Sequence, residues 1–303
     1  MKNGRQALCF VLLCATFGCG AKQELSAEQY YSKAAKEYRH GAYAVAIQNY
    51  RELLDQHPFS EYTEDAELKI GQAHYLDGSC PEAIAAFGDF QRRHPTSPNL
   101  PLVGYLIGGC YERQMRPPDR DQSAAQNAHA YYLAVTQQYP ASPFADLAQE
   151  RMEYCRDNMA RHEKLIADFY ASYANRQAAE FRLLDLVNRF NDTDVAGDAL
   201  FELGNLYQEQ GANERAALAF VAVTQYHSEN NVARQAEQAL ARLETKESLP
   251  HGDPLAALRE KAGRSRALAL TEVVDLPEKA SRPGFGGFGG IPGGGGPFGR
   301  GAY

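Results

Sequence analysis

A three-residue motif, which we call the ladder, occurs five times and constrains this chain more than any other feature. It consists of an alanine, a large side chain and a helix-ending residue. In the clearest copy, Ala83 is followed by Phe87 four residues later and by Pro95 twelve residues later. Positions i and i+4 share one helical face, so the alanine admits a neighbouring helix while the ring fills the groove beside it. Proline ends the helix. The other copies are Ala46–Tyr50–Pro58, Ala128–Tyr132–Pro140 and the weaker Ala179–Leu183–Asn191 and Ala216–Phe220–Ser228.

In three copies a glycine stands five residues before the alanine, at Gly41, Gly78 and Gly211. Glycine readily adopts a positive φ and thereby ends a preceding helix. Each copy therefore predicts a helix, a tight turn and a second helix. One such hairpin cannot bury its own apolar face, so the hairpins are expected to stack on one another.

The last copy resembles a tetratricopeptide (TPR) repeat, because Leu203-Gly204-x-x-Tyr207 precedes Ala216-x-x-x-Phe220. Successive ladder alanines are 37, 45, 51 and 37 residues apart, against about 34 in a typical TPR, so the middle units carry insertions. The predicted fold is an all-α TPR solenoid of five helical hairpins over residues 27–245. A closing helix is expected over residues 232–243.

A stretch without proline or glycine over residues 144–173 predicts an unusually long helix at the start of the fourth unit. Its apolar residues recur at helical spacing, and we expect them to contact neighbouring helices. They are Leu147, Met152, Cys155, Met159, Leu165, Ile166, Phe169 and Tyr173.

Residues 1–18 have the features of a signal peptide, with Lys2 and Arg5 before an apolar run that is too short to span a bilayer. The Gly18-Cys19 step resembles a bacterial lipobox, although Thr16 stands where leucine is usual. We therefore expect acylation of Cys19 and a tether over residues 19–26. The alternative is an ordinary leader that is cleaved and lost.

Residues 246–303 differ in composition from the repeats, and residues 284–303 contain eleven glycines. A segment with so little to bury predicts a disordered tail. The net charge of −7 and the lack of a basic run argue against nucleic-acid binding.

Candidate chemistry is sparse. His57, His94 and His227 recur at one repeat position, which favours repeat packing or a favourable charge at a helix C-terminus over a metal site. No pattern of catalytic, cofactor-binding or metal-ligating residues is found, so an enzyme is not predicted. Three cysteines lie outside the leader, at positions 80, 110 and 155. Cys110 and Cys155 could be bridged, or all three could be small buried apolar residues.

The order of short sequence motifs along the chain resembles that in the BamD family, lipoproteins of outer-membrane β-barrel assembly. HPFSEYTEDAEL follows the first unit, HPTSPN closes the second, a DRD insertion lies in the third, and the long helix opens the fourth. The resemblance covers residues 19–230. The glycine-rich tail has no counterpart in the family pattern.

The resemblance implies an acyl-anchored protein on the periplasmic face of the outer membrane of a Gram-negative bacterium. The implied partners are a BamA-type core protein, other Bam lipoproteins and unfolded outer-membrane proteins, whose C-terminal segment ends in an aromatic residue. Tyr62 matches a family tyrosine beside the substrate groove. Arg182 matches, less closely, an arginine near the BamA docking surface.

Tyrosines gather in the first two units and could line a concave TPR face, where their rings take apolar side chains and their hydroxyls bond a peptide. Each could equally be ordinary repeat packing. The candidate groove residues are Tyr30, Tyr31, Tyr38, Tyr62 and Tyr75.

A second function class remains open, a periplasmic TPR adaptor for cell division or cell-wall synthesis associated with the Tol–Pal system. Such proteins usually have a cleaved, non-lipidated leader and a coiled coil before the repeats. Cys19 and the lack of a heptad run before Tyr30 favour the assembly role.

Overall fold

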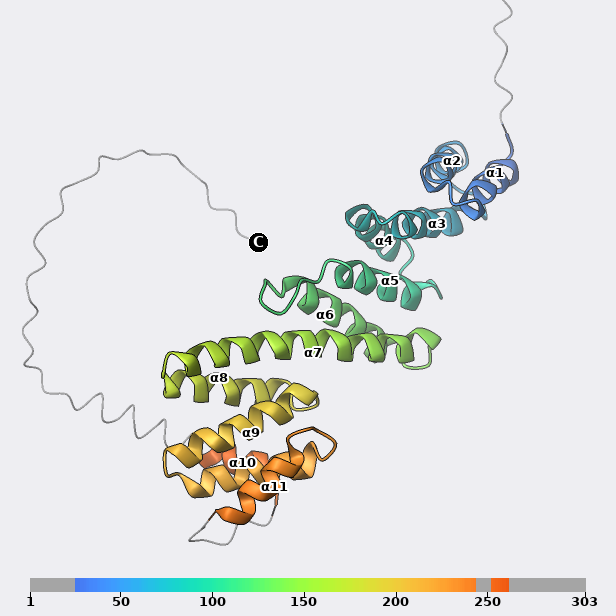
Figure 1. Cartoon of the computed structure of the whole chain (residues 1–303). Coiled ribbons are helices and arrows are strands. Elements are labelled where there is room, and N and C mark those ends of the chain that lie inside the picture. Colours follow the sequence, from blue (N-terminus) through green and yellow to red (C-terminus); the bar gives the residue numbers. More distant parts are fainter. Residues whose placement is uncertain (1–24, 244–251, 262–303) are drawn as a thin grey trace, which may run out of the picture.

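The computed structural model describes residues 25–243 and 252–261, and within them every regular element is a helix. The chain winds down a single stack from the first helix to the last (Figure 1). The helices are α1 (Ala27–Arg39), α2 (Tyr43–Gln56), α3 (Thr63–Leu76), α4 (Cys80–Arg93), α5 (Leu100–Glu112), α6 (Ser123–Gln138), α7 (Pro143–Ser172), α8 (Arg176–Arg189), α9 (Asp194–Glu209), α10 (Asn213–Tyr226) and α11 (Ala233–Arg242).

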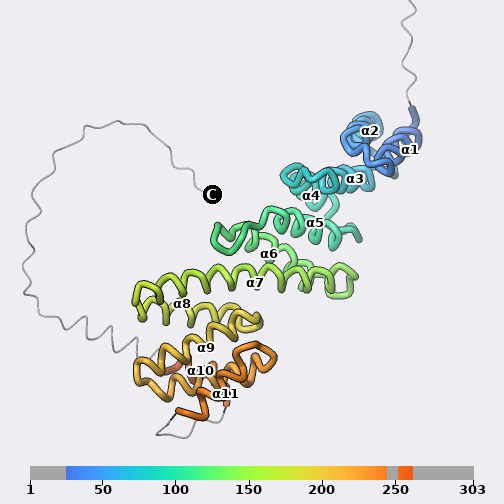
Figure 2. The backbone as a smooth tube through the Cα atoms, viewed as in Figure 1, coloured from blue at the N-terminus to red at the C-terminus, as the bar shows by residue number. Residues whose placement is uncertain are grey.

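Consecutive helices pair as hairpins, and each hairpin packs on the next (Figure 2). The pairs are α1–α2, α3–α4, α5–α6, α7–α8 and α9–α10, and α11 closes the stack on α10. First helices of successive hairpins also meet, since α3 contacts α5, α5 contacts α7 and α7 contacts α9. The predicted all-α solenoid of five hairpins with a closing helix is confirmed.

The ladder residues pack as their spacing predicts. All five alanines and all five large residues that follow them are at most 1% exposed. A glycine in the first helix makes room for the ring, because a Cβ on Gly204 would lie 2.4 Å from Phe220 Cε1. The same holds for Gly71 and the Phe87 ring, at 2.5 Å. Close helix approach is therefore built from a small residue facing a large one.

The turns between paired helices need one residue with a positive φ. Gly41, Gly78 and Gly211 have φ values of 76°, 80° and 69°. In the fourth hairpin Ala174 takes this place with φ 55°, a conformation that costs a residue with a Cβ about 1–2 kcal/mol. In the third hairpin, the inserted loop over residues 113–122 replaces the tight turn.

The long helix α7 is confirmed, but the contacts expected along it are only partly right. Cys155 and Met159 are buried, and Met152 and Ile166 are half-buried. The prediction was wrong for Leu147, Leu165, Phe169 and Tyr173, which are 44–73% exposed. The reason is geometric: α5, α6, α8 and α9 all contact α7, and these four side chains lie where the described helices leave its surface uncovered.

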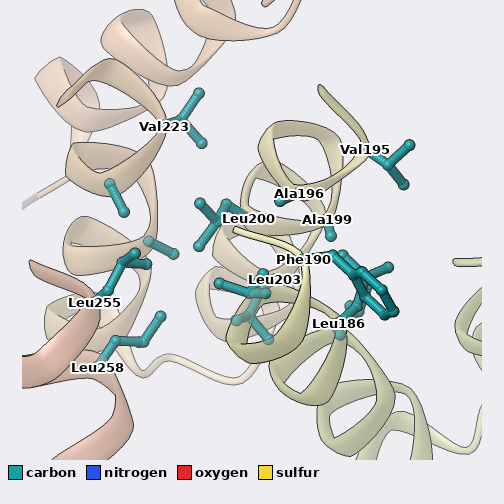
Figure 3. Close-up of a cluster of buried hydrophobic side chains, with 14 of the residues drawn as sticks. Leu186, Phe190, Val195, Ala196, Ala199, Leu200, Leu203, Val223, Leu255 and Leu258 are labelled. Atoms are coloured by element: carbon teal, nitrogen blue, oxygen red, sulfur yellow. The ribbon is translucent and has the colours of Figure 1, made fainter. Parts of the chain in front are cut away.

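The largest core cluster lies in the C-terminal half, where α8 and α9 pack through Leu186, Phe190 and Leu200 (Figure 3). A helical segment over residues 254–261 adds Leu255 and Leu258 to this cluster, at 5% and 1% exposure. Our boundary at residue 245 was therefore wrong for residues 252–261. Two leucines in a short helical turn supply enough apolar surface to dock it on the last repeat.

The three described cysteines are free thiols and buried, so Cys110 and Cys155 are not bridged. Burial, reinforced by contact with Cys80, raises the pKa of Cys110 to about 12. Cys155 donates toward Met115 Sδ at 3.7 Å, and burial raises its pKa to about 11. These cysteines therefore serve as small apolar core residues at neutral pH.

The signal peptide, Cys19, most of the tether and the glycine-rich tail lie outside the described residues, so their assignments stay predictions. Within the described residues, no helix combines the length and apolarity needed to cross a bilayer.

Candidate peptide-binding surface and docking site

Tyr31 and Tyr62 form a stacked pair over the seam between α1 and α3, with ring centroids 4.9 Å apart. Tyr31 also packs against the buried Tyr50 ring and donates its hydroxyl to Asp65 on α3. Burial, followed by the bond to Asp65, raises the pKa of Tyr31 to about 12. The pair therefore stays neutral at physiological pH and keeps a half-buried aromatic surface.

Two helical turns further along α1, Tyr38 repeats this arrangement. Its hydroxyl donates to Gln72 Oε1 at 3.4 Å, and Lys69 Nζ lies 5.3 Å from its ring centroid. The Tyr38 and Tyr31 bonds both span 34 residues, one TPR period. Equivalent tyrosines thus join two first helices and leave their ring faces partly exposed.

The remaining two candidate groove residues make other ring contacts. Tyr30 packs on His57 at 5.9 Å between ring centroids, at the end of α2. Tyr75 belongs to the interface of the second and third hairpins, where the Arg113 guanidinium lies 3.8 Å from its ring centroid. Tyr31, Tyr38 and Tyr62, which we call the tyrosine seam, pack with Tyr30 on one core cluster, and Tyr75 packs on the next.

Phe59 is a further candidate for the peptide-binding surface and was not among the predicted groove residues. It lies in the turn between α2 and α3, three residues before Tyr62, and is 99% exposed. An aromatic ring so exposed gains apolar contact only from a partner. The signal was present in the sequence, because Phe59 falls outside the ladder positions that form the core.

Arg182 lies on α8 and is only partly engaged. Its Nη1 is 3.4 Å from Glu163 Oε2 on α7, and its side chain is 35% exposed. Glu163 also accepts a closer hydrogen bond from Arg189, at 3.0 Å. Two guanidinium groups thus share the Glu163 carboxylate, and Arg189 also pairs with Asp185 at 3.0 Å, so the four side chains balance in charge. The exposed part of Arg182 remains accessible to a partner carboxylate.

The recurring histidines cap helices and do not converge. His57 Nε2 contacts Leu25 O at 2.9 Å, and His94 Nε2 contacts Glu67 Oε2 at 2.7 Å. His227 is buried behind Gly197. The described residues contain no group of three or more His, Cys, Asp or Glu side chains that could hold a metal ion. The interpretation as repeat packing therefore holds for these histidines.

Comparisons with known proteins relate the chain to a family. A family profile described as "Outer membrane lipoprotein" (YfiO) matches residues 23–220. The outer membrane protein assembly factor BamD of Caulobacter vibrioides is 31% identical, over 71% of this chain and 74% of that protein. BamD of Vibrio cholerae is 28% identical, over 67% and 90%. A solved TPR protein from Thermus thermophilus, 15% identical, covers 71% of this chain and all of its own, with a TM-score of 0.34.

The matched region covers the helical stack as far as α10, and these relatives are named outer membrane protein assembly factors. Family membership therefore favours the assembly role over the cell-division or cell-wall adaptor. With its five TPR hairpins and the profile match over most of its length, the chain belongs to the BamD (YfiO) family of outer membrane lipoproteins.

Proposed function

We propose that the tyrosine seam, together with Phe59, binds extended C-terminal segments of unfolded outer-membrane proteins. The observation that carries this proposal is the stacked Tyr31–Tyr62 pair, half-exposed and three residues from a fully exposed phenylalanine. Such a surface takes apolar and aromatic side chains on its rings and hydrogen bonds on its hydroxyl edges. The seam suits a segment ending in an aromatic residue.

We further propose that the C-terminal hairpins dock on a BamA-type core protein, with Arg182 at the contact, alongside other Bam lipoproteins. The large core of α7–α10 supports this division, because a rigid platform loses little freedom on docking. Cys19 would carry the acyl chains that hold the chain on the periplasmic face of the outer membrane.

A binding experiment tests the seam. A fluorescein-labelled peptide from the C-terminus of an outer-membrane protein is titrated with the full chain, and anisotropy is recorded. Tyr62→Ala combined with Phe59→Ala should weaken binding at least ten-fold, about 1.4 kcal/mol. The matched control is Tyr226→Ala, which removes an exposed tyrosine from the C-terminal half. Equal affinity of wild type and double variant, with helix content unchanged, would place the peptide elsewhere.

Docking is tested independently. Arg182→Glu should reduce recovery of the BamA-type protein from mild-detergent extracts, while leaving peptide affinity unchanged. Arg92→Glu is the matched control, since Arg92 is 74% exposed on α4 and forms an ion pair with Asp89 of its own helix. Equal recovery with both variants would exclude Arg182 from the contact.

A further inference from the structure

The C-terminal end of α7 carries an apolar stripe that the repeat stack leaves uncovered. Leu165, Phe169 and Tyr173 are spaced four residues apart and so lie along one side of the helix. They are 46%, 56% and 73% exposed. These are large apolar side chains on successive helical turns, and an exposed patch of this kind indicates a binding surface.

Beside the stripe lies a cleft of about 300 Å³, which we call the α7 cleft. Its walls are Pro118 and Asp119 of the inserted loop, and His162, Leu165, Ile166, Phe169 and Tyr170 of α7. A volume of this size is at the lower end for a ligand pocket and suits one or two large side chains.

The inserted loop is held in place as a wall of this cleft. His162 Nδ1 contacts Pro118 O at 2.6 Å, and Asn158 Nδ2 donates to Arg116 O at 3.3 Å. Both partners on the loop are backbone carbonyls, so its path is tied to α7. The cleft is therefore formed before an occupant arrives, which lowers the cost of binding.

The chain itself contains a segment of matching chemistry. Residues 284–303 lie outside the described part, and their sequence spaces large apolar side chains between glycines and prolines. Arg300 is the only charged residue among them. The apolar side chains are Phe285, Phe288, Ile291, Phe298 and Tyr303.

The geometry allows this segment to reach the cleft. Lys261, the last described residue, bonds Glu214 at the start of α10 at 2.8 Å. Glu214 follows the α9–α10 turn, which lies on the same edge of the stack as the α7–α8 turn (Figure 1). Arg176 of α8 and Glu209 of α9 pair across that edge at 3.5 Å. From α10 across α9 to α7, which α9 contacts directly, is two helix spacings, roughly 16–20 Å.

The chain is long enough to cover this span. Phe285 lies 24 residues beyond Lys261 and Phe298 lies 37 residues beyond it. Fully extended, 24 residues span at most about 80 Å, so both phenylalanines are within reach of the cleft.

We propose that the phenylalanines of residues 284–303 dock in the α7 cleft of the same chain and cover the apolar stripe. Occupancy by the tail removes exposed apolar surface from the free protein. Glu163, which holds Arg182, directly follows the cleft residue His162 on α7.

The test uses the absence of tryptophan from the chain. Phe288→Trp in the full chain introduces a single indole whose emission reports burial. We expect emission at shorter wavelength than from a free peptide of residues 280–303 carrying the same substitution. We also expect a several-fold smaller acrylamide quenching constant. Neither value should change on dilution.

Cleft variants decide the location. Leu165→Asp with Phe169→Asp should return the emission and quenching to those of the free peptide, while helix content stays constant because both side chains are exposed. Leu147→Asp is the matched control, an exposed leucine at the other end of α7. Free-peptide emission in the unaltered cleft background overturns the proposal. So does burial that survives the double substitution, and so does a shift that vanishes on dilution, which indicates docking between two chains.

Discussion

The two ends of the stack join the first helices of neighbouring hairpins through different side chains. In the first two hairpins, α1 and α3 are joined through tyrosines whose hydroxyls bond Asp65 and Gln72. In the C-terminal half, α7 and α9 pack directly, with Ala167, Ala196 and Ala199 in one continuous core. Figure 1 shows helical hairpins at both ends, but α7 has 30 residues and α1 has 13, so the two regions differ in helix length as well as in side chains.

This difference indicates that the two ends of the stack have different roles. A seam of half-buried tyrosines keeps polar edges and aromatic faces available, which suits binding of varied extended segments. A core of small and branched apolar residues leaves little to expose, and gives a rigid platform.

Truncating the C-terminal core should have the largest effect. Phe220→Ala removes a fully buried ring from the large cluster and should cost about 3–5 kcal/mol of unfolding free energy. Because repeats couple mainly to their neighbours, hydrogen exchange should quicken in α8–α11 and remain slow in α1–α4. Phe59→Ala, at a fully exposed site, is the control and should change stability by less than about 0.5 kcal/mol. Uniform loss of protection at both ends would mean one cooperative unit.

Two tyrosines at equivalent ladder positions should respond oppositely to loss of the hydroxyl. Tyr132 donates to Glu112 at 2.6 Å, so Tyr132→Phe should cost about 1–2 kcal/mol. The buried Tyr50 hydroxyl has no hydrogen-bond partner among the described residues, so Tyr50→Phe should be neutral or slightly stabilising. Urea unfolding of both variants measures the contrast. A clear loss in Tyr50→Phe would show that its hydroxyl is bonded in solution.

The turns offer a smaller, reciprocal comparison. Ala174 has a positive φ in the fourth turn, so Ala174→Gly should stabilise the chain by about 0.5–1 kcal/mol, a strain relief reduced by glycine's greater unfolded-state freedom. Gly41→Ala in the first turn should destabilise it by a similar amount. Thermal unfolding of the two single variants provides the check, and a destabilised Ala174→Gly would argue against strain at that residue.

Alkaline pH should affect the tyrosine seam through Tyr31. Its pKa is raised from 10.0 to about 12 in the folded chain, so the resulting stabilisation is complete below pH 10 and is lost as the pH rises toward 12. Exposure keeps the effect below about 1 kcal/mol. The stability advantage of wild type over Tyr31→Phe should therefore shrink between pH 10 and pH 12, measured by urea unfolding at each pH. A constant difference would mean that Tyr31 titrates normally.

Much of the fold could be predicted because its signals are local. The Ala–x–x–x–aromatic spacing places two side chains on one helical face whatever surrounds it, and glycine marks the tight turns at Gly41, Gly78 and Gly211. The same reasoning gave the length of α7. It placed four exposed side chains of α7 in contact because periodicity shows which residues share a face and not whether a neighbour covers it.

The candidate site was less predictable for the same reason. Tyr31, Tyr38 and Tyr62 were expected to share a surface with Tyr30 and Tyr75, yet Tyr75 packs on the core of the next hairpins and Tyr30 makes its ring contact with His57. Neither the packing of Leu255 and Leu258 on the last repeat nor the sharing of Glu163 by Arg182 and Arg189 has a local signal.

Local sequence thus decided the helices, the turns, the hairpin repeat and the family, because each depends on spacing within one or two helices. Tertiary structure alone decided which tyrosines meet, which face of α7 stays bare and where the stack ends. Those outcomes depend on contacts between residues tens of positions apart, whose geometry is set by the angle and depth at which one hairpin packs on the next.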